Sequence, residues 1–176
     1  MAKVRPTAEK HDAMNACYPG ALIVCPDFLL STLAMTMTDL LEDSLAPFGM
    51  RLRHYRLLRL LYAEGPRAQG SLGAAMQVDR TTVVAIVDFL ERLHLAKRTR
   101  CKDRRAYFVE LTAKGKAVAA EATERVNAVE EEIFAPLDSK EREVLRKLTT
   151  KLLVAPGPIA AVHARPRVAQ ARANAS

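Results

Sequence analysis

The chain has no tryptophan, and aromatic residues make up only 5% of its 176 residues. Proteins that bind single-stranded nucleic acid stack bases on aromatic side chains, so this composition argues against such a site. The longest apolar run near the start covers residues 21–25, and no run approaches the ~20 apolar residues that a membrane helix needs. We therefore expect a cytoplasmic protein that has no membrane segment.

Cysteine is also scarce, with Cys17, Cys25 and Cys101 as the three examples. An odd number without CxxC spacing or clustered histidines predicts neither a disulfide framework nor a metal site. The sequence also lacks a nucleophile with a matching base, so we expect no enzyme activity and no cofactor. Reduced thiols without a role are the simpler interpretation of the cysteines, and a redox-sensing thiol is the alternative.

The basic charge is concentrated in the middle of the chain. Hydrophobic residues make up 49% and charged residues 27%, as in a folded protein, and the net charge is +7. Residues 51–116 hold 15 Lys and Arg against 6 Asp and Glu, a net charge of +9, while the remainder carries −2. This asymmetry favours a basic nucleic-acid-binding module between nearly neutral helices, with a merely solvated basic face as the alternative.

Apolar residues recur at helical spacing along most of the chain. The pattern predicts helices over residues 28–46, 53–63, 69–76, 80–93, 113–134 and 141–153. Asp27, Asp79 and Thr112 are suited to cap three of these helices, and Asp138 with Glu141 forms a capping box. Residues 96–101 and 106–111 instead predict two short strands around the charged turn 102–105. The expected fold is mainly α with a small β-hairpin wing, an α+β arrangement.

The predicted helix over residues 80–93 has two different faces. Its buried stripe holds Val83, Ile86, Val87, Leu90 and Leu93, while Thr81, Val84, Ala85, Asp88 and Arg92 lie opposite. Small apolar residues on an exposed helix face fit a DNA major groove, because thymine methyl groups pack against them. Tolerance of scattered surface apolar residues is the alternative. The preceding short helix and the following basic hairpin complete a winged helix-turn-helix.

Residues 69–116 resemble the winged helix-turn-helix of MarR-type transcriptional regulators. The strongest matches are residues 78–83, 87–88 and 90–91, then Asp103 and Arg105 leading into residues 109–112, and Lys114-Gly115. The predicted elements match the family from about residue 28 to residue 153. Gln77 and His94 depart from it, because the family has glycine at these two turns. We expect both to adopt a left-handed backbone at a cost of ~1 kcal/mol each.

The resemblance implies a homodimer whose first helix and last two helices interleave with those of a partner. It divides the chain into an N-terminal arm (1–26), a dimerisation helix (27–50), the DNA-binding module (51–112), dimerisation helices (113–154) and a disordered basic tail (155–176). The apolar stripes of the outer helices favour this division independently, since a partner would cover them. Packing of these helices on their own chain is the alternative.

We expect a regulator that binds a pseudo-palindromic operator in double-stranded DNA, most simply as a repressor. The residues expected at or near base edges are Arg80, Thr81, Thr82, Val84, Ala85 and Asp88. The expected phosphate contacts are Gln69, Lys97, Arg98, Arg100 and Lys102. Arg104 is expected in the minor groove, with Asp103 and Arg105 bracing the wing. An architectural DNA-binding protein without an effector is an alternative function.

The regulatory input is open between two possibilities. The family resemblance implies a small aromatic or phenolic ligand, and Arg51, Arg53, His54 and Tyr55 are placed at the mouth of the cleft that would hold it. An Arg or His side chain there can bind a carboxylate. The alternative is a cysteine-based peroxide sensor that uses Cys25, which lies two residues before the position where the family carries the reactive thiol.

Overall fold

The computed structural model describes residues 18–100 and 107–159, which form two compact units. The first unit ends at Leu40 and contains α2 (Gly20–Ile23) and most of α3 (Pro26–Leu45). The expected cap at Asp27 is wrong, because α3 already begins at Pro26 and Asp27 lies inside its first turn. Proline suits the first helical position, since it lacks the N–H that would have no partner there.

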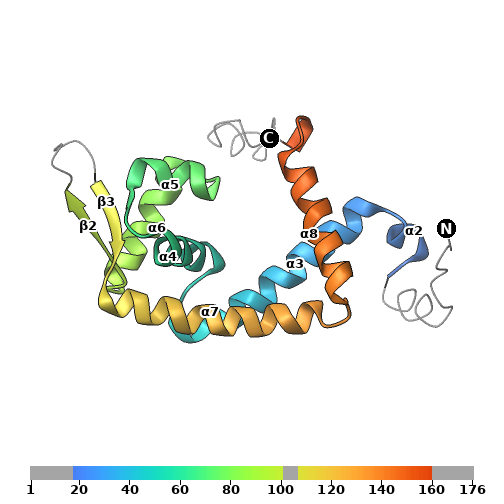
Figure 1. Ribbon diagram of the computed structural model, residues 1–176, viewed down its shortest axis with the longest axis horizontal. Coiled ribbons are helices and arrows are strands. Elements are labelled where there is room, and N and C mark those ends of the chain that lie inside the picture. The colour runs from blue at the N-terminus through green and yellow to red at the C-terminus, as the bar shows by residue number, and fades with distance from the viewer. Residues whose placement is uncertain (1–17, 101–106, 160–176) are drawn as a thin grey trace. The chain divides into compact units, whose positions relative to one another are not determined.

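The second unit begins at Leu41 and holds the predicted winged helix. After a short 3₁₀ turn, η1 (Ala46–Phe48), it contains α4 (Leu52–Glu64), β1 (Arg67–Ala68), α5 (Gln69–Met76) and α6 (Arg80–Arg92). The hairpin β2 (Ala96–Arg100) and β3 (Tyr107–Leu111) follows, and then α7 (Ala113–Phe134) and α8 (Ser139–Val154). Figure 1 shows α5 and α6 beside this hairpin, with α4 drawn between α5 and α7. The mainly helical fold with a small β wing is therefore confirmed.

The described strands form one antiparallel sheet in the order β1-β3-β2, so the predicted hairpin gains a third strand. β1 is two residues long and pairs Arg67 with Val109, which periodicity in so short a segment cannot reveal. Between β2 and β3 the register pairs Ala96 with Leu111 and Arg98 with Val109. The predicted turn, residues 102–105, lies outside the described residues.

The core of this unit lies where α4, α6, the sheet and α7 meet. The side chains with little or no exposure include Leu57, Leu58, Val83, Ile86, Val87, Leu90, Val109 and Val126. On α7 the buried residues are Gly115, Ala119, Ala122 and Val126, whereas Val118, Val129 and Ile133 are only partly buried. The small residues on this face let α7 approach the core closely, and Val118 and Val129 pack against the edge of the core.

Two turns and one glycine fix the geometry around α6. Gln77 and His94 have φ angles of 54° and 58°, so the predicted left-handed backbone is confirmed at both turns. Thr112 caps α7 by accepting a hydrogen bond from the Gly115 N–H at 2.9 Å, and its hydroxyl donates to the His94 carbonyl at 2.7 Å. A Cβ on Gly115 would lie 1.8 Å from the Leu95 carbonyl oxygen, so only glycine allows this contact between α7 and the turn after α6.

Candidate nucleic-acid interface

Helix α6 is held firmly at its start and buries one face. The Asp79 carboxylate accepts a hydrogen bond from the Thr82 N–H at 2.8 Å and another from the Thr82 hydroxyl at 2.6 Å. These hydrogen bonds from Thr82 lower the pKa of Asp79. The predicted cap at Asp79 is confirmed, and it leaves the first turn of α6 rigid.

The face of α6 opposite its buried stripe carries the residues that the sequence pattern predicts to be exposed. Arg80, Thr81, Ala85 and Asp88 are exposed, while Thr82 and Val84 are half-buried. The exposed residues form a ridge of small and polar side chains with Arg80 at its start. A ridge of this kind can enter a major groove without steric conflict and present hydrogen-bonding groups to base edges.

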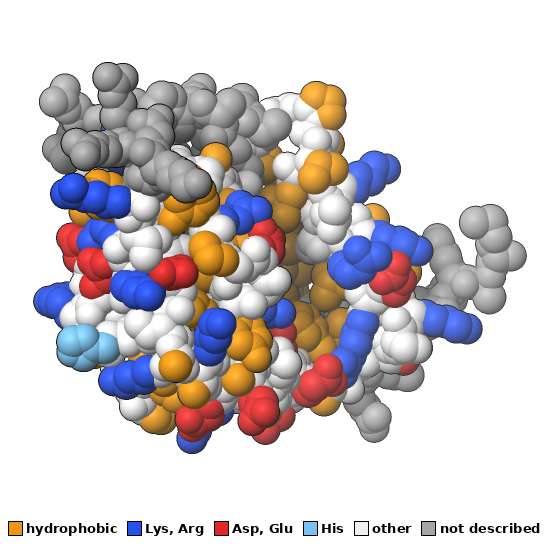
Figure 2. All heavy atoms as spheres, turned by 60° about the vertical axis from the view of Figure 1, so that its left-hand side comes forward, with side chains coloured by type: hydrophobic (Ala, Val, Ile, Leu, Met, Phe, Trp, Pro, Cys, Tyr) orange, Lys and Arg blue, Asp and Glu red, His pale blue; other side chains and the backbone are white. Residues whose placement is uncertain are grey.

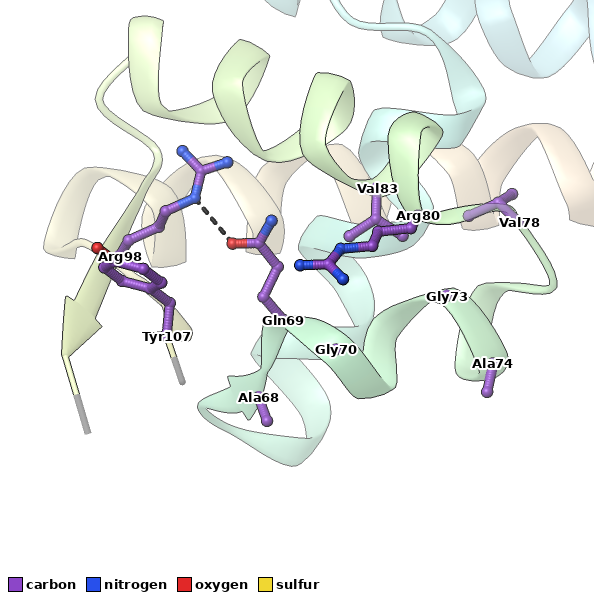
Figure 3. A pocket seen from close by; sticks show the side chains of 10 residues that line it. All are labelled: Ala68, Gln69, Gly70, Gly73, Ala74, Val78, Arg80, Val83, Arg98 and Tyr107. Carbon is purple, nitrogen blue, oxygen red and sulfur yellow. Dashed lines mark hydrogen bonds between the residues drawn. The ribbon is translucent and has the colours of Figure 1, made fainter. Parts of the chain in front are cut away.

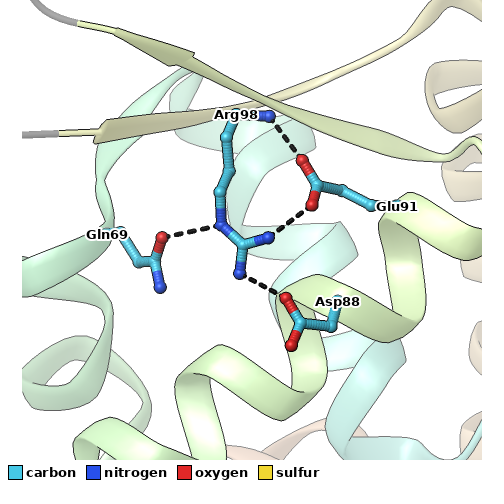
Figure 4. Close-up of polar contacts among 4 residues, drawn as sticks. All are labelled: Gln69, Asp88, Glu91 and Arg98. Carbon is cyan, nitrogen blue, oxygen red and sulfur yellow. Dashed lines mark hydrogen bonds and ion pairs between the residues drawn. The ribbon is translucent and has the colours of Figure 1, made fainter.

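Arg98 joins three elements of the winged helix through one guanidinium group (Figure 4). Its Nη2 donates to Asp88 Oδ1 at 2.6 Å, and its Nε donates to Gln69 Oε1 at 2.9 Å. Its Nη1 pairs with a carboxylate oxygen of Glu91, and its backbone N–H donates to the other at 2.7 Å. The side chain of Arg98 is 20% exposed.

This network changes what its members can do. Arg98 and Gln69 were both expected to contact phosphates, but here their side chains are hydrogen-bonded to each other. The guanidinium group of Arg98 also forms ion pairs with two carboxylates on α6. Charge-assisted hydrogen bonds of this kind fix orientation more strongly than neutral ones. The network therefore sets the position of β2 and the start of α5 relative to the exposed ridge of α6.

A depression of about 670 Å³ lies between α5, the start of α6 and the sheet (Figure 3). Gln69, Arg80, Arg98 and Tyr107 supply its polar lining, and Gly70, Gly73 and Val83 are among its apolar lining residues. Of the other expected phosphate contacts, Lys97 forms an ion pair with Glu110 at 3.2 Å, and Arg100 lies 5.9 Å from the ring centre of Tyr107. Lys102, Asp103, Arg104 and Arg105 lie outside the described residues.

A second hollow, of about 450 Å³, lies on the other side of α6. Its lining brings together Arg51, Arg53 and His54, three of the four residues expected at a ligand cleft. The remaining lining residues are Gly49, Thr82, Ala85, Ile86, Phe89 and Arg92. Tyr55, the fourth expected residue, does not line this hollow, because its side chain is buried in the core and its hydroxyl donates to Thr123 Oγ1 at 3.4 Å.

His54 lines this hollow as a neutral side chain. Its ring stacks on Phe89 with centres 3.8 Å apart, and its Nδ1 accepts a hydrogen bond from the Arg51 N–H at 3.0 Å. Burial, followed by the charge of Arg53, lowers the pKa of His54 to about 4. At neutral pH the positive charge of the hollow therefore comes from arginine side chains and not from His54.

Cys25, the residue expected to act in a redox sensor, lies just before α3. It is half-buried, and its Sγ donates to the Ala21 carbonyl oxygen at 3.5 Å. Cys17 and Cys101 lie outside the described residues. Within the ranges 18–100 and 107–159, no group of His, Cys, Asp and Glu side chains could hold a metal ion.

Figure 2 looks onto the winged-helix side, where basic side chains are spread across the face with acidic ones between them. The distribution of charge on this side follows from the central basic segment that the sequence predicts.

The described part of the chain has no helix that is both long and apolar enough to cross a membrane.

Comparisons with known proteins agree with this geometry. Residues 50–107 match the model of the MarR family. A MarR-family transcriptional regulator from Rhodococcus sp. RHA1 is 27% identical, with a TM-score of 0.69 over 77% of this chain and 96% of its own. CouR from Rhodococcus jostii RHA1, solved with p-coumaroyl-CoA, is 25% identical, with a TM-score of 0.70 over 79% and 99% of the two chains.

A structure that contains DNA shares the fold. MepR from S. aureus, solved as a complex with DNA, is 24% identical and has a TM-score of 0.68 over 73% of this chain and 96% of its own. The resemblance predicted from residues 69–116 is confirmed by the family match and by these structures.

Proposed function

We propose, from the premise that this chain carries a MarR-family domain over residues 50–107, that it is a homodimeric repressor that binds an operator in double-stranded DNA. The observation that carries the proposal is the exposed ridge of α6. Three features of α6 hold this ridge in place beside β2: the buried face of the helix, the cap at Asp79 and the Arg98 network. This function requires the protein to act in the cytoplasm, where the DNA is, and that location stays a prediction.

In the proposed complex, the ridge of each α6 enters a major groove of one operator half-site. Arg80, Thr81 and Ala85 are the exposed residues nearest the start of α6, and recognition helices read bases with their N-terminal residues. Asp88 has one carboxylate oxygen held by Arg98, which leaves Oδ2 for a base-edge donor such as the cytosine amino group.

Replacing Arg80 tests this placement. The Arg80→Ala variant is expected to bind a selected operator duplex about 1–3 kcal/mol more weakly and to discriminate less against a changed base pair at the contacted position. The matched control is Arg125→Ala, an exposed arginine on α7 that pairs with Glu121. Equal operator affinity and equal base discrimination for Arg80→Ala and the wild type in fluorescence anisotropy would remove Arg80 from the interface.

The outer helices support the homodimer. On α8, Val144, Leu148 and Leu152 follow one another at four-residue spacing and are 53%, 55% and 54% exposed. Their spacing places them on one helix face, and a second copy of the chain is the partner that a regulator of paired half-sites requires. Burial of this stripe against a partner would stabilise the dimer by about 25 cal/mol for each Å² of apolar surface removed from water.

The homodimer is tested by Leu148→Asp, which places a charge in this stripe. We expect this variant to sediment as a monomer at concentrations where the wild type sediments as a dimer. Thr150→Asp, which places a charge at an exposed site on the opposite face of the same helix, is expected to remain a dimer. A dimeric Leu148→Asp variant would show that α8 does not hold the two copies together.

We propose that a small aromatic acid in the hollow lined by Arg51 and Arg53 releases the repressor from DNA. Two observations support this proposal. The lining combines guanidinium groups with the apolar side chains of Ile86 and Phe89, and the chain is similar to a regulator solved with p-coumaroyl-CoA. Addition of p-coumarate is then expected to lower operator affinity. If peroxide lowers it instead, and Cys25→Ser abolishes the response, the redox alternative is supported.

A further inference from the structure

Helix α6 has two flanks, one on each side of its exposed ridge. Arg98 contacts Asp88 and Glu91 on the flank beside the wing. Thr82 and Phe89 line the 450 Å³ hollow on the other flank. Thr82 and Glu91 are nine residues apart, which at 3.6 residues per turn places them about 180° from each other around the helix. The wing and the hollow therefore lie on opposite sides of the ridge.

The hollow has the chemistry of an anion site. Three guanidinium groups line it, and its lining residues, all within the described part of the chain, include no Asp or Glu. Arg51 pairs with Glu42 at 3.1 Å, and that carboxylate also accepts from the Leu52 N–H at 3.3 Å. Because Glu42 offsets one of the positive charges, Arg53 and Arg92 supply the excess that an anion would meet.

The dimensions of DNA place an anion there. A major groove is about 12 Å wide, and a helix with its side chains is about 10–12 Å across. A helix that occupies the groove therefore has a sugar-phosphate backbone along each flank. Arg98 of β2 lies along one flank of α6, so the backbone along the opposite flank would face the hollow.

We propose that Arg53 and Arg92, with Arg51 beside them, bind phosphodiester groups of the DNA backbone on the side of α6 away from the wing. The inference rests on the proposed DNA-binding function. Arg92 is exposed and its guanidinium lies 5.6 Å from the ring centre of Phe89, while Arg53 is exposed at the start of α4. Arginine binds phosphate oxygens through two parallel N–H donors, so two such groups on one flank fix the register of the helix in its groove.

The hollow that we propose for the effector thereby has a second role. A carboxylate held by Arg53 would occupy the donors that the DNA phosphates need. Ligand and DNA would then meet on the same side chains, at the edge of the ridge formed by Thr82 and Ala85.

The experiment measures fluorescence anisotropy of the full chain with a 24-base-pair duplex of random sequence, across a range of salt concentrations. Binding without sequence preference depends on the neutralisation of phosphates, and the slope of log affinity against log salt falls by about 0.9 for each phosphate that is no longer neutralised. Because the proposed homodimer carries each substitution twice, Arg53→Gln and Arg92→Gln are each expected to lower the slope by about 1.8 and to weaken binding several-fold at low salt. Glutamine keeps a polar side chain at each position, and equal melting temperatures check that the variants fold.

Arg59→Gln is the matched control, because Arg59 is exposed on α4 but lines neither hollow. Its slope is expected to equal that of the wild type. Unchanged slopes for Arg53→Gln and Arg92→Gln overturn the proposal, and so does an equal drop for Arg59→Gln, which would indicate a diffuse charge effect. A wild-type chain that binds no duplex would instead contradict the proposed function itself.

Discussion

His54 gives a prediction whose size follows from the structure. Its pKa is about 4 in the folded protein against 6.5 for a free histidine, because the ring is buried and faces Arg53, Arg51 and Arg92, with Glu42 acting in the opposite direction. Folding thus favours the neutral ring. As pH falls from about 6.5 to 4, the unfolded chain takes up a proton that the folded chain refuses, so stability is lost over that interval and the loss levels off below it.

The difference of about 2.5 between these pKa values corresponds to at most about 3 to 4 kcal/mol, at 1.36 kcal/mol for each pKa unit. Between about pH 7.5 and pH 4.5, the expected loss that His54 contributes to the free energy of unfolding is about 2 to 3 kcal/mol. The measurement is urea denaturation followed by circular dichroism at both pH values. Carboxylates also titrate in this interval, so the quantity to compare is the loss in the wild type and in His54→Gln.

In His54→Gln the pH-dependent loss is expected to be smaller than in the wild type by that amount, whatever the stability of the variant at neutral pH. His94→Gln is the control, because His94 is exposed and its replacement leaves the ring of His54 in place. An equal loss in the wild type and His54→Gln would show that the His54 ring is accessible to water, and the prediction would then be wrong.

Three further predictions concern the winged helix. Gln77→Gly is expected to raise stability by up to about 1 kcal/mol in denaturant melts, because glycine adopts a φ of 54° without strain. Gly115→Ala is expected to abolish or strongly reduce folding, since its Cβ would lie 1.8 Å from the Leu95 carbonyl oxygen, and soluble expression with a native melting temperature would contradict this. Arg98→Ala is expected to lower operator affinity more than Arg98→Lys does, because lysine still offers charge to Asp88, and equal affinities would show that the network does not position the interface.

Local signals in the sequence predicted most of the fold correctly. The Asp79 cap, the boundaries of α5 and the buried stripe of α6 depend on residues within a few positions of each other. Such features depend little on the rest of the chain. The left-handed turn at Gln77 was predicted on a different basis, because the family that the sequence resembles has glycine at this turn.

Contacts between distant residues were not predictable from one sequence. Arg98 and Gln69 are 29 positions apart. The charge of Arg98 and the place of Gln69 at the start of a helix indicated phosphate contacts, and the structure shows the two side chains hydrogen-bonded to each other. The sequence likewise placed His54 and Tyr55 together at a ligand cleft. In the structure His54 is neutral and stacked on Phe89, and Tyr55 points into the core. Burial and charge pairing depend on the packing of whole elements, which spacing along the chain does not encode.

Sequence-specific binding of double-stranded DNA, on which the proposed function depends, can be measured as a ratio of affinities. The full chain is titrated at a fixed salt concentration against duplex DNA from upstream of its own gene and against a random duplex of equal length. We predict that the upstream DNA binds about 10³-fold more tightly or better, as specific regulators do. A ratio near one would contradict the proposed function and would leave an architectural DNA-binding protein as the better description.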